Sequence, residues 1–441
     1  MKKHTVCLLN DSFPPIIDGV ANVVVNYADI IEREYGHAVV VTPAVPGADD
    51  SGFGFPVLRF PSIDTRKQFG YVTGYPFSAD VMIKVRKERA ELLHLHCPAT
   101  SALLARQLKE TLNLPLIMTY HTKYDIDIAK LVRSKLIQDS AIAALIQNVR
   151  ACDEIWTVSR GAGENLRSLG YEGSYIVMEN GVDLPRGRAA EAEIEKAVSE
   201  YNLPADVPVY LFVGRLMWYK GIRIILEALA KLKKQGSSFR MVFIGDGQDR
   251  EEIKEYASEL GLAKLCCFTG ALSDRETLRA WYSRADLFLF PSTFDTNGLV
   301  VREAAACSLP SVLIEGSCAA EGVTDGRNGF LIKENAASML AKLQELTERP
   351  ETVKKVGECA AEELYLSWEE SVGRAAARYE TVLENFRCGK YPRKPGVRDL
   401  LSDIRSSQST AKEKLIAAKT ETRQRLQKGK ETFWEYLDRY L

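Results

Sequence analysis

The chain has 441 residues, of which 46% are hydrophobic and 27% are charged, as in ordinary globular proteins. This length exceeds a single typical core and predicts two domains with an appendage. No run of eighteen apolar residues is present, and Asn10 and Asp11 end the first apolar stretch too early for a signal peptide, so neither a spanning helix nor secretion is expected. Nine scattered cysteines without a CxxC pair favour reduced thiols in the cytoplasm over a structural zinc site.

In the first half, short apolar runs alternate with helical patterns, which predicts a parallel sheet covered by helices on both faces. A loop from Phe13 to Gly19 follows the first strand, and an amphipathic helix is predicted over Val20–Glu34. The predicted strands are Thr5–Leu9, Ala38–Thr42, Leu92–His96, Leu116–Thr119 and Glu154–Val158.

A second series with the same alternation follows the turn Glu179–Pro185. Its predicted strands are Val209–Val213, Met241–Ile244, Cys267–Thr269, Leu287–Phe290 and Ser311–Ile314. We therefore predict an α/β fold with two doubly wound domains facing each other across a cleft, over residues 1–200 and 201–366. Ligands collect at the carboxyl ends of the strands in such sheets. A helix over 367–388 follows.

The charge of the chain is unevenly distributed. The formal net charge is −1, yet the segment from Arg387 to Leu441 carries 14 Lys and Arg against 7 Asp and Glu. This asymmetry predicts a basic, helical tail over 389–441 that has a partner of its own.

The most informative segment runs from Phe294 to Glu303. Asp295 and Glu303 stand eight positions apart across a turn at Gly298, and small helix-forming residues follow. The pattern predicts a loop that leads into a helix N-terminus, where the amides of Gly298, Leu299 and Val300 face an anion. A phosphate at these amides and hydroxyls at the two carboxylates indicate one kind of ligand, a nucleotide sugar.

Two cations, Arg215 and Lys220, follow the predicted strand Val209–Val213 within Gly214–Gly221. Fixed positive charges at a strand end suit the developing charge of a diphosphate leaving group. A solvated corner with incidental charges explains this segment equally well by itself. The carboxylate segment downstream in the same domain favours the diphosphate interpretation.

Three features of the first domain are less specific. The loop Phe13–Gly19 allows backbone to approach a phosphate or a sugar, although a plain βα loop is a fair alternative. His121 comes just after a strand end, where sites gather, and we expect it to line the cleft. Asp125 and Asp127 match a DxD metal signature, but N-capping of a helix is the better explanation, so neither a metal nor a cofactor is predicted.

Taken in order along the chain, these features resemble the family-4 retaining glycosyltransferases, whose GT-B fold has two Rossmann-like domains. The resemblance covers about residues 4 to 386. The matching segments are Phe13–Gly19, Leu95-His96, His121-Thr122, Asn180–Asp183, Gly214-Arg215, Lys220-Gly221, Ile244–Gly247, Pro291-Ser292 and Asp295–Glu303.

The resemblance implies an N-terminal acceptor domain, a C-terminal nucleotide-sugar domain, and a helix over 367–388 that crosses back onto the first. By the same resemblance, Arg215 and Lys220 would hold the donor diphosphate, while Glu303 would bind the ribose hydroxyls. Asp295 would contact the donor sugar. The amides from Gly298 onward would face sugar or phosphate.

In the first domain the resemblance implies that Gly19 closes on the diphosphate and that His121 approaches the transferred sugar and the acceptor. The family retains configuration without an evident enzymic nucleophile, which implies attack by the acceptor on the leaving-group side with the phosphate as base. Asp295 replaces the usual glutamate, so its carboxylate is drawn back by roughly 1.5 Å, one C–C bond. An active enzyme is favoured over a weakened one because the other elements are intact.

Two basic surfaces with apolar residues indicate the class of acceptor. Lys130, Arg133 and Lys135 lie with Leu131, Leu136 and Ile137 on a helix predicted over Ile128–Ile146, which suits anionic lipid. The basic tail ends in Phe433, Trp434, Tyr436 and Tyr440 and suits the same surface. We expect a cytoplasmic, peripherally membrane-bound enzyme that moves a hexose, glucose from UDP-glucose, onto a lipid such as diacylglycerol. The alternatives are a soluble sugar or glycan acceptor, or a non-catalytic nucleotide-sugar-binding subunit; no nucleic-acid motif is present.

Overall fold

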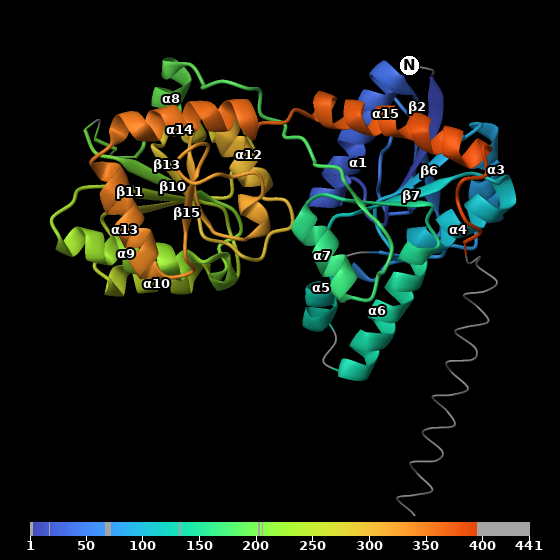
Figure 1. Ribbon diagram of the computed structural model, residues 1–441, viewed down its shortest axis with the longest axis horizontal. Coiled ribbons are helices and arrows are strands. Elements are labelled where there is room, and N and C mark those ends of the chain that lie inside the picture. The colour runs from blue at the N-terminus through green and yellow to red at the C-terminus, as the bar shows by residue number, and fades with distance from the viewer. Residues whose placement is uncertain are drawn as a thin grey trace, which may run out of the picture.

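The computed structural model describes residues 3–394 apart from 17, 67–71, 132–133, 202 and 205. Two lobes lie side by side, the N-terminal one in blue and green and the C-terminal one in yellow and orange (Figure 1). The predicted tail over 389–441 lies outside the described residues from 395 onward. All nine cysteines are free thiols.

The N-terminal lobe has a seven-stranded sheet in the order β3-β2-β1-β6-β7-β8-β9, with every neighbouring pair parallel. Its strands are β1 His4–Leu9, β2 Gly36–Pro43, β3 Val57–Phe60, β6 Leu92–Leu95, β7 Leu116–Tyr120, β8 Glu154–Thr157 and β9 Ile176–Val177. A small antiparallel pair consists of β4 Ser62–Ile63 and β5 Thr73–Gly74. The helices are α1 Gly19–Ile30, its π-helical extension η1 Ile31–Tyr35, α3 Ala79–Lys87, α4 Thr100–Leu112, α5 Tyr124–Leu131, α6 Lys135–Arg150 and α7 Arg160–Ser168.

The C-terminal lobe has a six-stranded parallel sheet in the order β12-β11-β10-β13-β14-β15. Its strands are β10 Val209–Val213, β11 Arg240–Ile244, β12 Cys266–Gly270, β13 Leu287–Phe290, β14 Ser311–Ile314 and β15 Phe330–Ile332. Its helices are η2 Trp218–Lys220, α9 Ile222–Lys234, α10 Arg250–Glu259, α11 Arg275–Arg284, α12 Leu299–Ala306, η3 Cys318–Ala320, α13 Ala336–Thr347 and α14 Pro350–Glu363. The helix α8 Glu191–Val198 lies in the connection between the sheets and packs on α11.

Both sheets are parallel and apolar on both faces, as expected when helices cover each side. The predicted fold class, two doubly wound Rossmann-like domains, is therefore confirmed. The last helix, α15 Trp368–Arg387, begins with a capping box in which Ser367 accepts from Glu370 N. Its buried residues, Val372 and Tyr379 among them, share a core cluster with β1 and α1, so the helix packs on the N-terminal domain.

One predicted element is wrong. Instead of one helix over Ile128–Ile146, α5 ends at Leu131 and α6 begins at Lys135. Ser134 precedes α6 in an extended conformation, which is the conformation of a residue at the start of a helix. The side chains of Lys130, Leu131 and Arg133 lie outside the described residues. No helix in the described part is long and apolar enough to cross a membrane.

Candidate donor-binding site

The carboxyl ends of the two sheets meet at the junction of the domains. In the first sheet, β7 and β8 pair with Tyr120 opposite Thr157, so His121 and Ser159 follow neighbouring strand ends. In the second sheet, the loop after β13 carries Asp295. Ser159 Oγ donates to the backbone carbonyl of Thr296 and so joins the two edges. This is the edge at which open α/β sheets bind ligands.

The loop after β13 leads into the N-terminus of α12, as predicted. Gly298 occupies the left-handed region with φ of 60°, and a Cβ there would lie 2.9 Å from Ala319 Cα. Both the backbone conformation and the close packing therefore favour glycine at this position. Val301 N donates to Gly298 O at 2.8 Å. The amides of Leu299 and Val300 precede it in the first turn, where helices have no internal acceptor and attract anions.

Lys220 and Asp295 form an ion pair inside this site. Lys220 Nζ lies 2.7 Å from Asp295 Oδ2, and the two side chains are only 9% and 22% exposed. Ser292 Oγ donates to the same carboxylate oxygen at 2.7 Å. The ammonium group also lies within 6.0 Å of the ring centroids of Phe290 and Phe294, where cation–π attraction holds it.

Arg215 differs from Lys220 in its surroundings. It follows β10 and Gly214, its side chain is exposed, and within the described part of the chain it forms no ion pair. Its guanidinium is thus available to a ligand, whereas Lys220 has to share its charge with Asp295. The sequence predicted both cations together but not this difference.

Glu303 is buried on α12 and is held by two side chains of α11. Arg275 Nη2 donates to its Oε1 at 2.7 Å, and the Tyr282 hydroxyl donates to its Oε2 at 2.9 Å. Burial, together with the Glu303 charge, raises the pKa of Tyr282 well above its usual value, so this phenol stays a donor. Arg275 also lies 3.7 Å from Asp183, in the connection between the domains. Each carboxylate oxygen still has a lone pair for a ribose hydroxyl.

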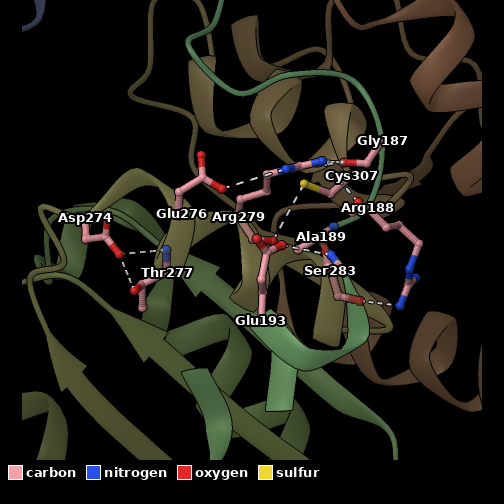
Figure 2. Close-up of polar contacts among 11 residues, drawn as sticks. Gly187, Arg188, Ala189, Glu193, Asp274, Glu276, Thr277, Arg279, Ser283 and Cys307 are labelled. Atoms are coloured by element: carbon pink, nitrogen blue, oxygen red, sulfur yellow. Dashed lines mark hydrogen bonds and ion pairs between the residues drawn. The ribbon is translucent and has the colours of Figure 1, made fainter. Parts of the chain in front are cut away.

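Sequence reasoning missed Arg275 and Tyr282, because nothing local distinguishes them on a polar helix. Other side chains of the same helix bind the connection between the domains (Figure 2). Arg279 Nη2 donates to Gly187 O at 3.2 Å, and Ser283 Oγ accepts from Ala189 N at 2.8 Å. Helix α11 therefore links the interdomain connection to the carboxylate of Glu303.

His121 is buried and paired with His96, the residue after β6. Their Nε2 and Nδ1 atoms are 3.0 Å apart. Burial lowers the pKa of His121 to about 3 and that of His96 well below its usual value, so both imidazoles are neutral at neutral pH. His121 Nδ1 and His96 Nε2 are buried and find no partner among the described residues. In either tautomer one of these nitrogens is a donor and the other an acceptor, which suits sugar hydroxyls.

The remaining predicted residues lie as follows. Gly19 is the exposed first residue of α1, with Asp18 as its N-cap and open space where a Cβ would be. Asp125 is inside α5 and accepts from Asn165 Nδ2 at 3.2 Å, so the N-capping prediction for it is wrong. Within the described ranges there is no group of His, Cys, Asp and Glu side chains that could hold a metal ion.

Two family models match consecutive parts of the chain. The one described as "Glycosyltransferase Family 4" matches residues 17–186, and the one described as "Glycosyl transferases group 1" matches residues 193–363. An alpha-monoglucosyldiacylglycerol synthase of Acholeplasma laidlawii is 25% identical over 356 residues, which cover 78% of this chain and 88% of that protein. A second protein with that name, from Streptococcus pneumoniae, is 23% identical over 69% of this chain and 70% of its own.

Solved structures share the fold. A sucrose-phosphate synthase from Thermosynechococcus elongatus has a TM-score of 0.69 at 21% identity, covering 87% of this chain and 100% of that chain. HepE from Anabaena, in complex with UDP and glucose, has a TM-score of 0.66 at 19% identity, covering 85% and 99%. The solved structures show the GT-B fold, and the two family models with the curated relatives show the family. The chain is therefore a hexosyltransferase of glycosyltransferase family 4, built on the GT-B fold.

Proposed function

We propose that this enzyme transfers a hexose, glucose from UDP-glucose, with retention of configuration to a lipid acceptor such as diacylglycerol. The observation that carries this proposal is the similarity along nearly the whole length of a diacylglycerol-acting relative, 88% of the Acholeplasma protein. A match confined to the nucleotide domain would support the donor alone. Here the matched region includes the N-terminal domain, which we assign to the acceptor.

The donor side of the proposal rests on charge and geometry. A nucleoside diphosphate brings negative charge, and the site offers Arg215, Lys220 and the first-turn amides of α12 for it. Glu303 is fixed by two donors and presents its remaining lone pairs to the ribose hydroxyls. HepE, with the same fold, has been solved with UDP-glucose, which supports uracil as the base.

For the transfer step we infer that the acceptor hydroxyl attacks on the side of the departing diphosphate, whose oxygen takes the proton. Arg215 and Lys220 would stabilise the charge that develops on this leaving group. His121 would act as a neutral hydrogen-bonding group for a sugar hydroxyl, because its lowered pKa leaves no proton to donate as an acid near pH 7. No metal is needed in this scheme.

The lipid side of the proposal rests on the first turn of α6. Leu136 and Ile137, two adjacent large apolar side chains, are 78% and 56% exposed. Figure 1 shows α6 projecting from the N-terminal domain. Lys135 beside them is 3.0 Å from Asp139, so this helix offers apolar contact more than net positive charge. The basic residues of the tail are the proposed source of attraction to anionic lipid.

A soluble acceptor is the second candidate, because D-inositol 3-phosphate glycosyltransferases are also similar. The one from Streptomyces bingchenggensis is 27% identical over 63% of this chain and 64% of its own. The other alternative from the sequence, a non-catalytic subunit that binds nucleotide sugar, rested on Asp295 alone and conflicts with the hexosyltransferase assignment.

The test has three arms. Thermal shift with a panel of nucleotide sugars identifies the donor, since a ligand at 100 times its Kd adds about 2.7 kcal/mol to stability. Transfer is then measured to diacylglycerol in vesicles and to soluble acceptors such as inositol phosphate. Flotation with anionic and zwitterionic vesicles, for the full chain and a chain ending at Cys388, measures lipid attachment.

We expect glucosylated diacylglycerol from UDP-glucose, and loss of transfer in Arg215→Ala and Glu303→Ala but not in Lys231→Ala, an exposed cation on α9. Transfer to inositol phosphate and not to lipid would establish the second candidate. Donor binding without transfer or hydrolysis under any condition would refute the proposed reaction. Absence of vesicle binding at low salt would refute lipid attachment.

A further inference from the structure

The N-terminus of helix α7 belongs to the acceptor domain but is bound by the C-terminal domain. Figure 1 shows α7 on the side of its lobe that faces the other lobe. Ser159 is the N-cap: its Oγ accepts from Ala162 N at 3.0 Å and gives its own proton to Thr296 O. Thr296 is the residue after Asp295. One hydroxyl therefore both begins α7 and holds the loop that carries the proposed sugar contact.

A carboxylate of the C-terminal domain binds the next two amides of the same helix. Glu321 follows η3, and its two oxygens accept from Arg160 N at 2.7 Å and Gly161 N at 2.6 Å. First-turn amides of a helix lack internal partners, and the positive end of the helix dipole favours a carboxylate there. Both hydrogen bonds are charge-assisted, which makes them the stronger kind.

Two glycines allow η3 to lie between α7 and the Asp295 loop. A Cβ on Gly161 would lie 2.4 Å from Cys318 Sγ, and a Cβ on Gly298 would lie 2.9 Å from Ala319 Cα. A side chain at Gly298 would meet the backbone of η3, whereas one at Gly161 would meet the side chain of Cys318. The segment 318–321 thus contacts the acceptor domain on one side and the donor loop on the other.

We propose that Ser159 and Glu321 are positioning residues for transfer: they fix the loop 294–298, and with it Asp295, against the strand end that carries His121. The inference rests on the proposed donor role of Asp295. Neither residue is placed against the nucleotide, so its contribution lies in the alignment of the donor sugar with the acceptor domain. Misalignment of reacting groups lowers turnover without weakening binding of the leaving nucleotide.

The first test separates turnover from binding. Glu321→Gln keeps the shape of the side chain but replaces one accepting oxygen with an NH2 group. Ser159→Asp keeps a good N-cap, but its carboxylate cannot donate to Thr296 O. We expect kcat to fall about 10-fold in each, the effect of one lost charge-assisted or interdomain hydrogen bond. UDP affinity by calorimetry and Tm should stay near wild type. Glu315→Gln, an exposed carboxylate before η3, is the matched control and should change nothing.

Unchanged kcat in both variants would overturn the proposal. An equal loss of UDP affinity would also overturn it, because the residues would then act on nucleotide binding.

The second test needs no transferase activity, so it distinguishes failure of this inference from failure of the proposed function. The Cβ position at Gly161 is 3.5 Å from Cys318 Cβ, within the range that a disulfide spans. In Gly161→Cys, mild oxidation should link position 161 to Cys318, detected by peptide mass spectrometry, with Cys318→Ser as the negative control. Adding Glu321→Gln should slow the cross-link about 10-fold. A cross-link that forms at the same rate without Glu321 would show that this carboxylate does not hold the domains together.

Discussion

Replacement of Lys220 by methionine gives two measurable losses with different causes. The substitution removes the ammonium group and keeps most of the apolar stem. Breaking a buried ion pair costs about 3–5 kcal/mol, and the lower end applies because Asp295 is 22% exposed and keeps Ser292 as a donor. For a domain of this size about 3 kcal/mol corresponds to a Tm lower by about 6–12 °C. The C-terminal transition in scanning calorimetry measures it.

The second loss is in donor binding. A diphosphate that no longer meets the ammonium group loses a charge-assisted hydrogen bond, and UDP affinity by titration calorimetry should fall about 10- to 100-fold. The double variant Lys220→Met, Asp295→Asn tests the separation of the two causes. It leaves no unpaired charge, so Tm should recover to within about 3 °C of wild type, about 1 kcal/mol, while UDP affinity stays low. If UDP affinity recovers with Tm, Lys220 acts only on stability and its assignment to the diphosphate is wrong.

Three further predictions concern Glu303, His121 and Gly298. Tyr282→Phe removes the donor to Glu303 Oε2, so UDP affinity by calorimetry should fall about 10-fold. Because the pKa of His121 is lowered when folded, its stabilising effect is complete above pH 6.5 and is lost as pH falls from 6.5 toward 3. Lowering the pH from 7 to 5 should therefore cost about 2 kcal/mol through this group, and His121→Gln should flatten the pH profile of denaturant unfolding by that amount. Gly298→Ala should lower kcat/KM at least about 10-fold, because the added methyl group meets Ala319 and disfavours the left-handed backbone.

The predictions for Tyr282 and Gly298 have matched controls. Tyr201→Phe alters a ring that packs edge-on against Trp281 and should leave UDP affinity unchanged. Gly316→Ala has the same backbone strain, at φ of 76°, but no atom within 4 Å of the new methyl group, so it isolates the steric part. An equal loss of activity in both glycine variants would refute the close packing of η3 on the Asp295 loop. An acid profile that His121→Gln leaves unchanged would refute a lowered pKa for this histidine.

The sequence was sufficient for the fold because the signals of the fold are local. Runs such as Val209–Val213 are apolar, bounded by turns and long enough for a buried strand, and the structure has the strand over the same residues. The break between α5 and α6 was missed although Ser134, a favourable N-cap residue, signals it. The partners of the carboxylates could not be predicted from the sequence, for a different reason. Arg275 is 28 residues from Glu303, and Glu321 is 160 residues from Gly161, so only the packing of helices brings them together.

The contacts of Asp295 support our proposal that aspartate can serve at the position where the resemblance implies glutamate. Lys220 and Ser292 both bind Asp295 Oδ2 and so fix the position of the carboxylate. In the proposed mode of donor binding, Oδ1 is the oxygen left for a sugar hydroxyl. The short side chain is thus placed by two donors, and the backbone that carries it is placed by Ser159 and by η3. A longer side chain at this position would have to leave Ser292 or displace Lys220. The aspartate therefore fits the way this chain fixes its loop, and we propose that the sugar it selects depends on where Ser159 and Glu321 hold that loop.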